Sequence, residues 1–505
     1  MTDSHHTSEL PKGWAWTELK EIAIEINSGF PSGRWKRGAE NGVPHLRPMN
    51  IDTKGKIDLA DVKYVQAEGY DALSKGDVVF NNTNSPELLG KTAYIREDTN
   101  WAYSNHMTRI RFVPSLMEPA FIGHYLHFLF RNGYFKTRCV HHVNQASIGK
   151  DFLSRMRIPF PPSSEQKRVV TKLGELFACL DAGVEGLRKV KAQLKRYRQA
   201  VLKYAFEGKL TEEWRKTHKD QLEPATKLLE KITQERLIDL EKNKKLSPIG
   251  SFELPALPEG WIWTRVDWLC DVQTGPFGTQ LHRDDYTSSG IPTIEIGDVH
   301  PTRDLREGTA HFIAKEKAIE LKRFEVKHGD VLFSRVGTVG RCTIVPEGCD
   351  GWIMSTSLIR VRIVSKYLLS KHLLFYFWSP IAQGFAKRTS KGTTRAGTNS
   401  RIVGELPLII PHVMEQQIIV EEIERRLTGV DNIEQTLNQN LTRASRLRQS
   451  ILKIAFQGKL VPQDPSDEPA EKLLERIREG KAKSKGEKDT NSKNKSQLEL
   501  STYVK

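Results

Sequence analysis

The chain has few cysteines and no long apolar run. Its five cysteines, in 505 residues, are scattered and form no CxxC pair, so the sequence predicts a reducing compartment rather than a disulfide framework. The N-terminal MTDSHHTSELPKGW lacks the apolar centre of a secretion signal, and LLFYFW at 373–378 is too short to cross a bilayer. We therefore expect a cytoplasmic location.

The sequence also lacks the motifs of a DNA-modifying enzyme. It has no FxGxG loop for a methyl donor and no NPPY or DPPY run to hold a flipped base; Asn84-Ser85-Pro86-Glu87 lacks the second proline and the aromatic. SPELLGKT (85–92) resembles a phosphate-binding loop, but a serine opens it and strand-like AYI follows. His141-His142 has no partner at metal-ligand spacing. We expect a binding protein with no catalytic residue, metal site or cofactor of its own.

Basic residues outnumber acidic ones in the chain as a whole. Lys and Arg number 77 against 62 Asp and Glu, which gives a net charge of +15. Such an excess favours a polyanionic partner, most simply nucleic acid. Charge alone also fits a basic but otherwise ordinary protein, so the organisation of the chain has to decide between the two.

The chain carries the same signals twice. RQAVLKYAFEGKL at 198–210 returns as RQSILKIAFQGKL at 448–460, and LPKGWAWT at 10–17 returns as LPEGWIWT at 257–264. The spacing of 250 residues (458 − 208 for the glycine) is far longer than a solenoid repeat of ~20–50 residues. It indicates duplication of a domain-sized module, and two similar but unequal halves can read a partner that itself has two parts.

Each copy begins with a region of mixed secondary structure. VPHLRP, KGDVVF, KTAYI and RIRF in the first copy are answered in order by IPTIEI, HGDVLF, GRCTIV and IRVRI in the second. These are strand-length runs bounded by turn residues, and helical stretches follow in both copies. The predicted fold class is α/β (α+β): two domains, 10–161 and 257–411, of ordinary size, which alternate with long helices.

A seven-residue apolar period follows each mixed region. It runs through Leu173, Leu180, Leu187, Leu194 and Val201, and again through Ile423, Val430, Leu437, Ala444 and Ile451. This period is typical of coiled coils, so we expect the two helices to pair as an antiparallel coiled coil with pseudo-two-fold symmetry. Ser163 or Ser164 is the expected N-cap of the first helix. The alternative is two helices packed into separate cores.

These signals set the remaining boundaries. The helical regions span 162–240 and 412–480, and a linker rich in Lys, Ser and Pro joins the halves at 241–256. The basic tail at 481–505 is rich in Lys, Ser and Asn and is expected to be disordered.

The candidate DNA-binding residues lie in loops of the two mixed domains. Arg and Lys suit guanine edges and phosphates, and Asn suits adenine. The set in the first domain is Arg34, Lys36, Arg37, Arg47, Asn81, Asn82, Asn84 and Asn105. The set in the second domain is His282, Arg283, Arg335, Arg341, Lys387, Arg388, Lys391, Arg395 and Arg401. The polar counterpart of the last run is HHVNQASIGKD at 141–151.

With these motifs in place, the chain resembles the specificity subunit of a type I restriction-modification system. The markers are the two LPxGWxWT openings, the two P-x3-EQ helix starts (161–166 and 411–416) and the two RQ-x2-LK-x-AF-x-GKL helix ends. The resemblance implies a prokaryotic protein with two target-recognition domains, each of which reads half of a split, asymmetric sequence in double-stranded DNA. It implies that paired helices fix the separation of the halves.

The resemblance also implies partners. Two methyltransferase subunits would dock on this chain, and two restriction (translocase) subunits can join them. S-adenosylmethionine, ATP and Mg²⁺ would then bind to those partners. Two other readings stay open: a self-contained enzyme, for which the chain has no space outside the repeats, and a coiled-coil scaffold without sequence-specific DNA binding.

Overall fold

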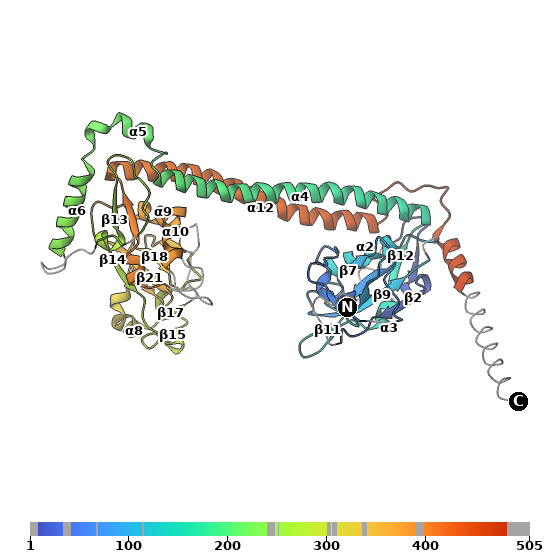
Figure 1. Cartoon of the computed structure of the whole chain (residues 1–505). Helices are drawn as coiled ribbons and strands as arrows, with labels where there is room; N and C mark the ends of the chain where they lie inside the picture. The colour runs from blue at the N-terminus through green and yellow to red at the C-terminus, as the bar shows by residue number, and fades with distance from the viewer. Residues whose placement is uncertain are drawn as a thin grey trace. The chain divides into compact units, whose positions relative to one another are not determined.

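The chain forms two compact units, each described by itself. A computed structural model describes residues 9–33, 42–66, 69–113, 116–239, 248–250, 252–299, 305, 311–335, 341–389 and 398–481. Unit 1 comprises 1–187 and 439–505, and unit 2 comprises 188–438 (Figure 1). Each unit therefore contains one mixed domain and parts of both long helices. Residues 482–505 of the tail and residues 241–247 and 251 of the linker lie outside the described residues.

Unit 1 is built on a four-stranded antiparallel sheet in the order β2-β9-β5-β7. Two smaller sheets, β4-β3-β8 and β10-β11-β6, and the pair β1-β12 complete the strands. The elements are β1 (Ala15–Glu18), α1 (Leu19–Ile22), β2 (Glu25–Ser28), β3 (Val43–Leu46), η1 (Pro48–Asn50), β4 (Lys63–Val65), β5 (Val78–Asn81), β6 (Thr83–Asn84), β7 (Thr92–Tyr94), β8 (Ala102–Tyr103), β9 (Met107–Arg111), α2 (Pro119–Arg131), β10 (Val140–His141), β11 (Ala146–Ser147), α3 (Lys150–Ser154), β12 (Arg157–Phe160) and α4 (Ser163–Phe206). A helix over 470–481 belongs to the same unit.

Unit 2 repeats this plan with the sheet β14-β21-β18-β19 and the pair β13-β22. A second sheet has the order β15-β17-β16-β20. The elements are α5 (Glu212–Thr217), η2 (Lys219–Gln221), α6 (Ala225–Asp239), β13 (Ile262–Arg265), α7 (Val266–Leu269), β14 (Cys270–Thr274), η3 (Arg283–Asp285), β15 (Tyr286–Thr287), β16 (Ile291–Ile294), β17 (Phe312–Ile313), α8 (Lys315–Glu320), η4 (Lys322–Phe324), β18 (Val331–Ser334), β19 (Cys342–Ile344), β20 (Ile353–Met354), β21 (Leu358–Ile363), α9 (Ser370–Trp378), α10 (Pro380–Thr389), α11 (Ser400–Gly404), β22 (Pro407–Ile410) and α12 (Val413–Phe456).

The predicted strands are confirmed in both copies. KGDVVF contains β5 and HGDVLF contains β18, at the same place in equivalent sheets. The mixed character and the duplication of the domains are also confirmed. The N-cap prediction is wrong, because α4 begins at Ser163 itself and Pro162 precedes it; the Pro162 carbonyl accepts a hydrogen bond from the Gln166 amide.

The core of each domain is completed by the helix end of the other repeat. In unit 1 the Phe456 ring, from the end of α12, lies 5.3 Å from Phe121 and 5.1 Å from Tyr125 between ring centroids. In unit 2 Phe206, from the end of α4, lies 5.2 Å from Tyr376. The AF dipeptide of each RQ-x2-LK-x-AF-x-GKL segment thus closes a domain that a different copy encodes.

The other repeated motifs form the junction between domain and helix. The Trp14 indole donates to Glu165 Oε2 at 3.0 Å, and the Trp261 indole donates to Glu415 Oε2 at 2.8 Å. The following glutamines bond equivalent backbone groups: Gln166 accepts from the Glu118 amide and donates to the Pro161 carbonyl. Gln416 does the same with Leu369 and Pro411.

Glycine is required at the end of each long helix. Gly208 and Gly458 have φ of +73° and +66°, a conformation that favours glycine after a helix. A Cβ at Gly208 would lie 2.4 Å from Pro258, and one at Gly458 would lie 2.3 Å from Pro11. The GKL of one copy therefore packs on the LPxGW of the other, which explains why the two motifs occur together.

The long helices contact each other within each unit. In unit 1, Arg448 of α12 bonds Asp181 of α4 at 2.5 Å and lies 4.2 Å from the centroid of the Phe177 ring. In unit 2, Lys191 of α4 bonds Asn438 of α12 at 2.8 Å, and Arg198 of α4 bonds Asp431 of α12 at 2.6 Å. From the first pair to the second, the position moves seven residues forward in α4 and seven residues back in α12. The two segments in unit 2 therefore run antiparallel.

Because the core of each domain is completed by the helix end of the other repeat, substitutions at the two helix ends should have opposite effects on the two domains. Removing the Phe456 ring leaves a cavity against α2, and Phe to Ala in a core costs ~3–5 kcal/mol. In Phe456→Ala, hydrogen exchange should accelerate in α2, while α9 keeps its protection. Phe206→Ala is the matched control and should do the reverse. Equal loss in both helices from either variant would contradict the closure.

Candidate nucleic-acid interface

Several loops of the first domain meet at one end of its main sheet. The amide of Phe30 bonds the Tyr103 carbonyl, and the Asn105 amide bonds the Phe30 carbonyl. The Asn82 amide bonds the His106 carbonyl, and Ile148 donates to the Asn82 carbonyl. The loop after β2, the turn after β5, the turn before β9 and the loop before α3 are thus joined directly. We call this the polar end of the domain.

The second domain has the same polar end. Gly275 donates to Leu358, Arg335 donates to Ser357, and Thr398 donates to the Arg335 carbonyl. Arg335 therefore stands at the position of Asn82. Gly29 and Gly275 mark the same close crossing, because a Cβ would lie 1.9 Å from the Tyr103 carbonyl oxygen in one and 2.1 Å from the Ser355 carbonyl oxygen in the other.

Among the residues predicted from the sequence, Asn81, Asn82, Asn84 and Asn105 lie at the polar end of the first domain, and Arg335 lies at that of the second. Lys387 and Arg388 lie on α10, and Arg401 lies on α11. Arg34, Lys36, Arg37, Lys391 and Arg395 fall outside the described residues. Arg47 directly follows β3, whose Leu46 carbonyl accepts a hydrogen bond from the Ser104 amide, and its guanidinium donates to the Asp61 carbonyl at 3.0 Å. Exposed side chains are those of Asn105, His282, Arg283, Lys387, Arg388 and Arg401. Asn84, Arg335 and Arg341 are partly buried.

Two of the predicted residues hold the polar end together from inside. Asn81 and Asn82 are buried. The Asn82 amide nitrogen donates to Thr108 Oγ1 at 2.9 Å and to the Asn105 carbonyl at 3.1 Å. The Asn81 amide nitrogen donates to the Leu88 carbonyl. In this structure both residues position the turns, and their side chains face the interior of the domain.

The β10–β11 hairpin lies within the polar run at 141–151, from which the sequence predicted no individual DNA-binding residue. This hairpin pairs with β6, and the His142 amide closes its turn on the Gln145 carbonyl at 2.7 Å. Val143 at the tip is 99% exposed, and Asn144 and Gln145 are exposed as well. Figure 1 shows β11 at the edge of the domain remote from α4. The sequence shows that the HHVNQ segment is polar, but it does not show that the segment projects from the domain.

The second domain presents an aromatic ring that the sequence analysis also missed. Phe277 follows β14 and is 58% exposed, and the Arg335 guanidinium lies 6.0 Å from its ring centroid. Gln280 donates its backbone amide to the Phe277 carbonyl, so the turn that holds this ring leads directly to His282 and Arg283. Basic and aromatic groups are combined here, and arginine is a residue that contacts phosphates and base edges of nucleic acids.

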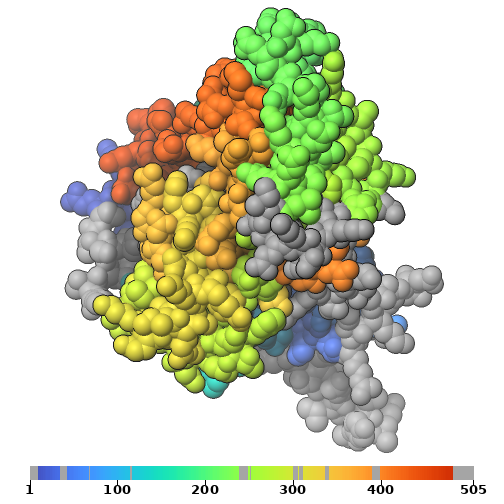
Figure 2. All heavy atoms as spheres, turned by 90° about the vertical axis from the view of Figure 1, so that its left-hand side faces the viewer, coloured from blue at the N-terminus to red at the C-terminus, as the bar shows by residue number. Residues whose placement is uncertain are grey.

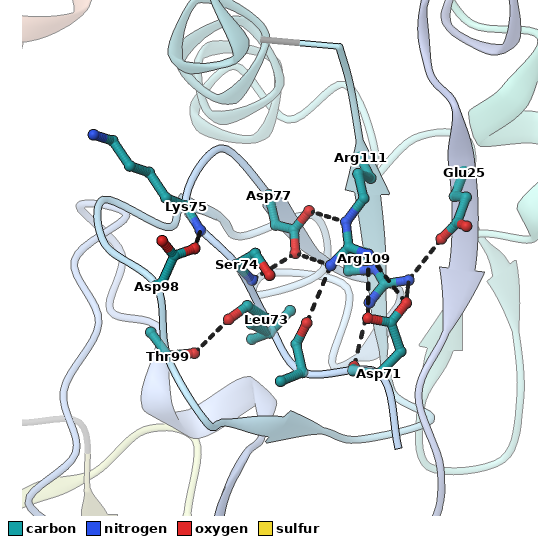
Figure 3. Close-up of polar contacts among 11 residues, drawn as sticks. Glu25, Asp71, Leu73, Ser74, Lys75, Asp77, Asp98, Thr99, Arg109 and Arg111 are labelled. Carbon is teal, nitrogen blue, oxygen red and sulfur yellow. Dashed lines mark hydrogen bonds and ion pairs between the residues drawn. The ribbon is translucent and has the colours of Figure 1, made fainter. Parts of the chain in front are cut away.

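The duplicated arginines of RIRF and IRVRI form ion pairs toward the opposite end of the main sheet in each domain. Arg111 forms two bonds of 2.8 Å to Asp77 (Figure 3). Arg362 repeats this with Asp330 at 2.8 and 2.6 Å. Arg109 is 2% exposed and bonds Glu25 and Asp71. Its hydrogen bond lowers the pKa of Asp71. These cations are neutralised inside the domain, so they stabilise the scaffold.

The described residues hold neither a metal-ligand cluster nor a candidate membrane span. No group of three His, Cys, Asp or Glu side chains among them could hold a metal ion. None of the helices within the described ranges is long and apolar enough to cross a bilayer.

Comparison with known proteins agrees with this organisation. A family model described as the type I restriction modification DNA specificity domain matches residues 11–190 and 258–443. The specificity subunit of type I restriction enzyme EcoKI from Escherichia coli (strain K12) is 26% identical over 506 residues, which cover 96% of this chain and 99% of that protein. That of EcoBI from Escherichia coli is 29% identical over 347 residues, 66% of this chain and 67% of that protein.

One solved structure shows the same fold. A chain described under complex assembly and conformational transition of the type I R-M system superposes with a TM-score of 0.56 at 19% identity, covering 90% of this chain and 100% of that one. The family model matches both copies of the repeat, with their polar ends and their LPxGW openings. The chain therefore belongs to the type I restriction-modification DNA specificity family.

Proposed function

We propose that each domain of this DNA specificity subunit reads one half of a split, asymmetric DNA sequence with its polar end. The observation that carries the proposal is that equivalent backbone hydrogen bonds build two polar ends whose exposed groups differ: the tip of the β10–β11 hairpin in the first domain, and Phe277 beside Arg335 in the second. Two equal scaffolds with unequal ends suit two different half-sites. The scaffold alternative, a coiled-coil protein without sequence-specific DNA binding, is not favoured by the family match.

In the first domain the β10–β11 hairpin is proposed to enter the major groove. A two-stranded ribbon fits that groove, and Asn and Gln can pair with the edge of adenine. Val143 then meets a thymine methyl group. The exposure of Val143, Asn144 and Gln145 supports this role, and the pairing of β11 with β6 holds the hairpin at the polar end.

We further propose that α4 and α12 form an antiparallel coiled coil that sets the gap between the half-sites. All ten heptad residues predicted from the sequence are buried or partly buried. The Asp181–Arg448 and Arg198–Asp431 pairs lie beside this apolar seam, the position where ion pairs set partner and register in coiled coils.

Catalysis is proposed to reside in partner subunits. Two methyltransferase subunits would dock at the duplicated helix ends, and two restriction subunits can join them in a cytoplasmic complex of a prokaryotic cell. S-adenosylmethionine, ATP and Mg²⁺ would be bound by those partners. The duplication of the RQ-x2-LK-x-AF-x-GKL ends supports two equivalent docking positions.

Exchanging one domain should change one half of the recognised sequence. Residues 257–411 are replaced by the matching domain of a relative, with Trp261 retained so that its bond to Glu415 persists. Mapping of methylated adenines in the host should show one new half and one unchanged half. The reciprocal exchange of 10–161 is the control. If both halves changed in either hybrid, the two-reader proposal would be wrong.

Truncating the hairpin tip should weaken only the half read by the first domain. The pair Asn144→Ala and Gln145→Ala removes base contacts worth ~1–3 kcal/mol each in discrimination, so binding to the cognate site should fall at least about ten-fold. Glu97→Ala is the control, since Glu97 is exposed beyond β7, at the sheet end where Ile95 bonds Asp77. Equal affinities for both variants in a gel-shift titration would remove the hairpin from the interface.

Lengthening the paired helices should widen the preferred gap. Seven residues inserted after Leu187 and after Leu441 lie at facing points, given the Asp181–Arg448 and Lys191–Asn438 pairs, and preserve the heptad. Each helix grows by ~10 Å, or about three base pairs at ~3.4 Å each. The half-sites should stay and the gap should grow, or binding should be lost through rotation. Full activity at the old gap is the contrary result, and the same insertion within 241–256 serves as control.

A further inference from the structure

The two junctions between domain and helix differ in the groups that pair with the buried glutamate. In unit 2, Glu415 is 1% exposed and fully paired. Its Oε1 accepts from Thr211 Oγ1 and from the Arg215 guanidinium, both at 2.7 Å. Arg215 also donates to the Gly208 carbonyl at 2.7 Å and lies 5.4 Å from the centroid of the Trp261 ring. A carboxylate, a carbonyl and an indole face thus form a site for one guanidinium, which this chain fills itself.

In unit 1 the same frame lacks its cation. Trp14 donates to Glu165 Oε2, and Gly458 lies beside Trp14 and Pro11. Glu165 is 1% exposed, and its Oε1 has no hydrogen-bond partner among the described residues. The segment after GKL explains the difference. It reads VPQDPSD at 461–467, shorter than 211–222 in the other copy, and contains no Lys or Arg.

A cavity of about 360 Å³ opens beside Glu165. Its lining includes Lys12, Trp14, Asp464, Asp467 and Glu471, so it is acidic within a strongly basic chain. The corresponding cavity of unit 2 is lined by basic and acidic side chains together, among them Arg215, Lys216, Glu212 and Asp220, and neither Trp261 nor Glu415 borders it. In that unit the neighbouring α5 and α6 are exposed at the surface (Figure 2).

The charges around Glu165 are consistent with a missing partner. Burial raises its pKa, which the Trp14 bond and the charge of Arg168 offset only in part. Arg168 itself is bonded to Asp467 at 2.6 Å. Gln463, on the rim, lies near enough to lower that pKa slightly. A buried carboxylate oxygen without a donor is costly, so a cation that reached it would be held firmly.

We propose that this cavity binds an arginine side chain of a partner protein, whose guanidinium takes the place in unit 1 that Arg215 fills in unit 2. A planar guanidinium can donate to the carboxylate while its plane lies flat on the indole, a geometry that the tetrahedral ammonium of a lysine does not match. DNA is excluded as the occupant because the cavity is acidic. The inference rests on the proposed function, since a subunit that docks at the helix ends is the partner that would present this arginine.

The first test uses ethylguanidine as the probe and the full chain labelled with 5-fluorotryptophan. The fluorine resonance assigned by Trp14→Phe should shift saturably with ethylguanidine and stay still with ethylammonium. In Glu165→Gln the affinity should fall about ten-fold or more. The Trp261 resonance should respond only in Arg215→Ala, which empties the twin site. A Trp14 resonance that ignores ethylguanidine overturns the proposal, whatever Trp261 does.

The second test uses the methyltransferase subunit that acts with this chain. Glu165→Gln should weaken the docking of one of two bound copies about ten-fold or more in mass-based titration, while DNA binding by the isolated chain stays unchanged. Unchanged docking together with a responsive Trp14 would overturn the protein-partner assignment. If the unaltered chain failed to bind DNA sequence-specifically, the proposed function would be wrong, but the result for the cavity would still hold.

Discussion

The structure depends on apolar closure across the two repeats. The domain that begins at Leu10 is completed by Phe456, and the domain that begins at Leu257 is completed by Phe206. Aromatic rings of this size contribute much of a core's burial, so neither domain can be finished by its own copy alone. Gly458 against Pro11 and Gly208 against Pro258 fix the same exchange at the backbone. The motifs that recur in the sequence are those that make this closure.

Because the helix ends complete each core from one side, the polar end on the other side of each domain can carry different side chains. The bidentate Arg111–Asp77 and Arg362–Asp330 pairs brace one end of equivalent sheets. At the other end the backbone bonds are equivalent while the side chains are not, as Asn82 and Arg335 illustrate. A constant frame with a variable polar end allows one protein to hold two different sets of base contacts. Glu165 Oε1, which lacks a hydrogen-bond partner among the described residues, shows that the junctions between domain and helix have also diverged, at the face where we propose that a partner subunit docks.

The sequence predicted the parts of the fold that depend on local pattern. Strands such as β5 and β18 followed from apolar runs between turn residues, and the long helices followed from the heptads. Residue type could not show whether a polar side chain points outward: Asn82 suits adenine chemically, yet it is buried among backbone groups. Nor could a duplicated sequence show which helix end closes which domain, because both ends fit both openings. The prediction of Ser163 as an N-cap was wrong because α4 already begins at Ser163, directly after Pro161-Pro162.

The most direct measurement of this account is the mass and folding of half chains. Residues 1–240 contain the first domain but lack Leu452, Phe456 and Leu473, which belong to its core. Sedimentation equilibrium combined with hydrogen exchange should find no folded monomer of this half: it should be unfolded, or be a dimer in which 201–232 closes the partner copy. Adding residues 248–505 should give a one-to-one complex with native protection. A monomeric half chain with native protection in α2 would contradict the account.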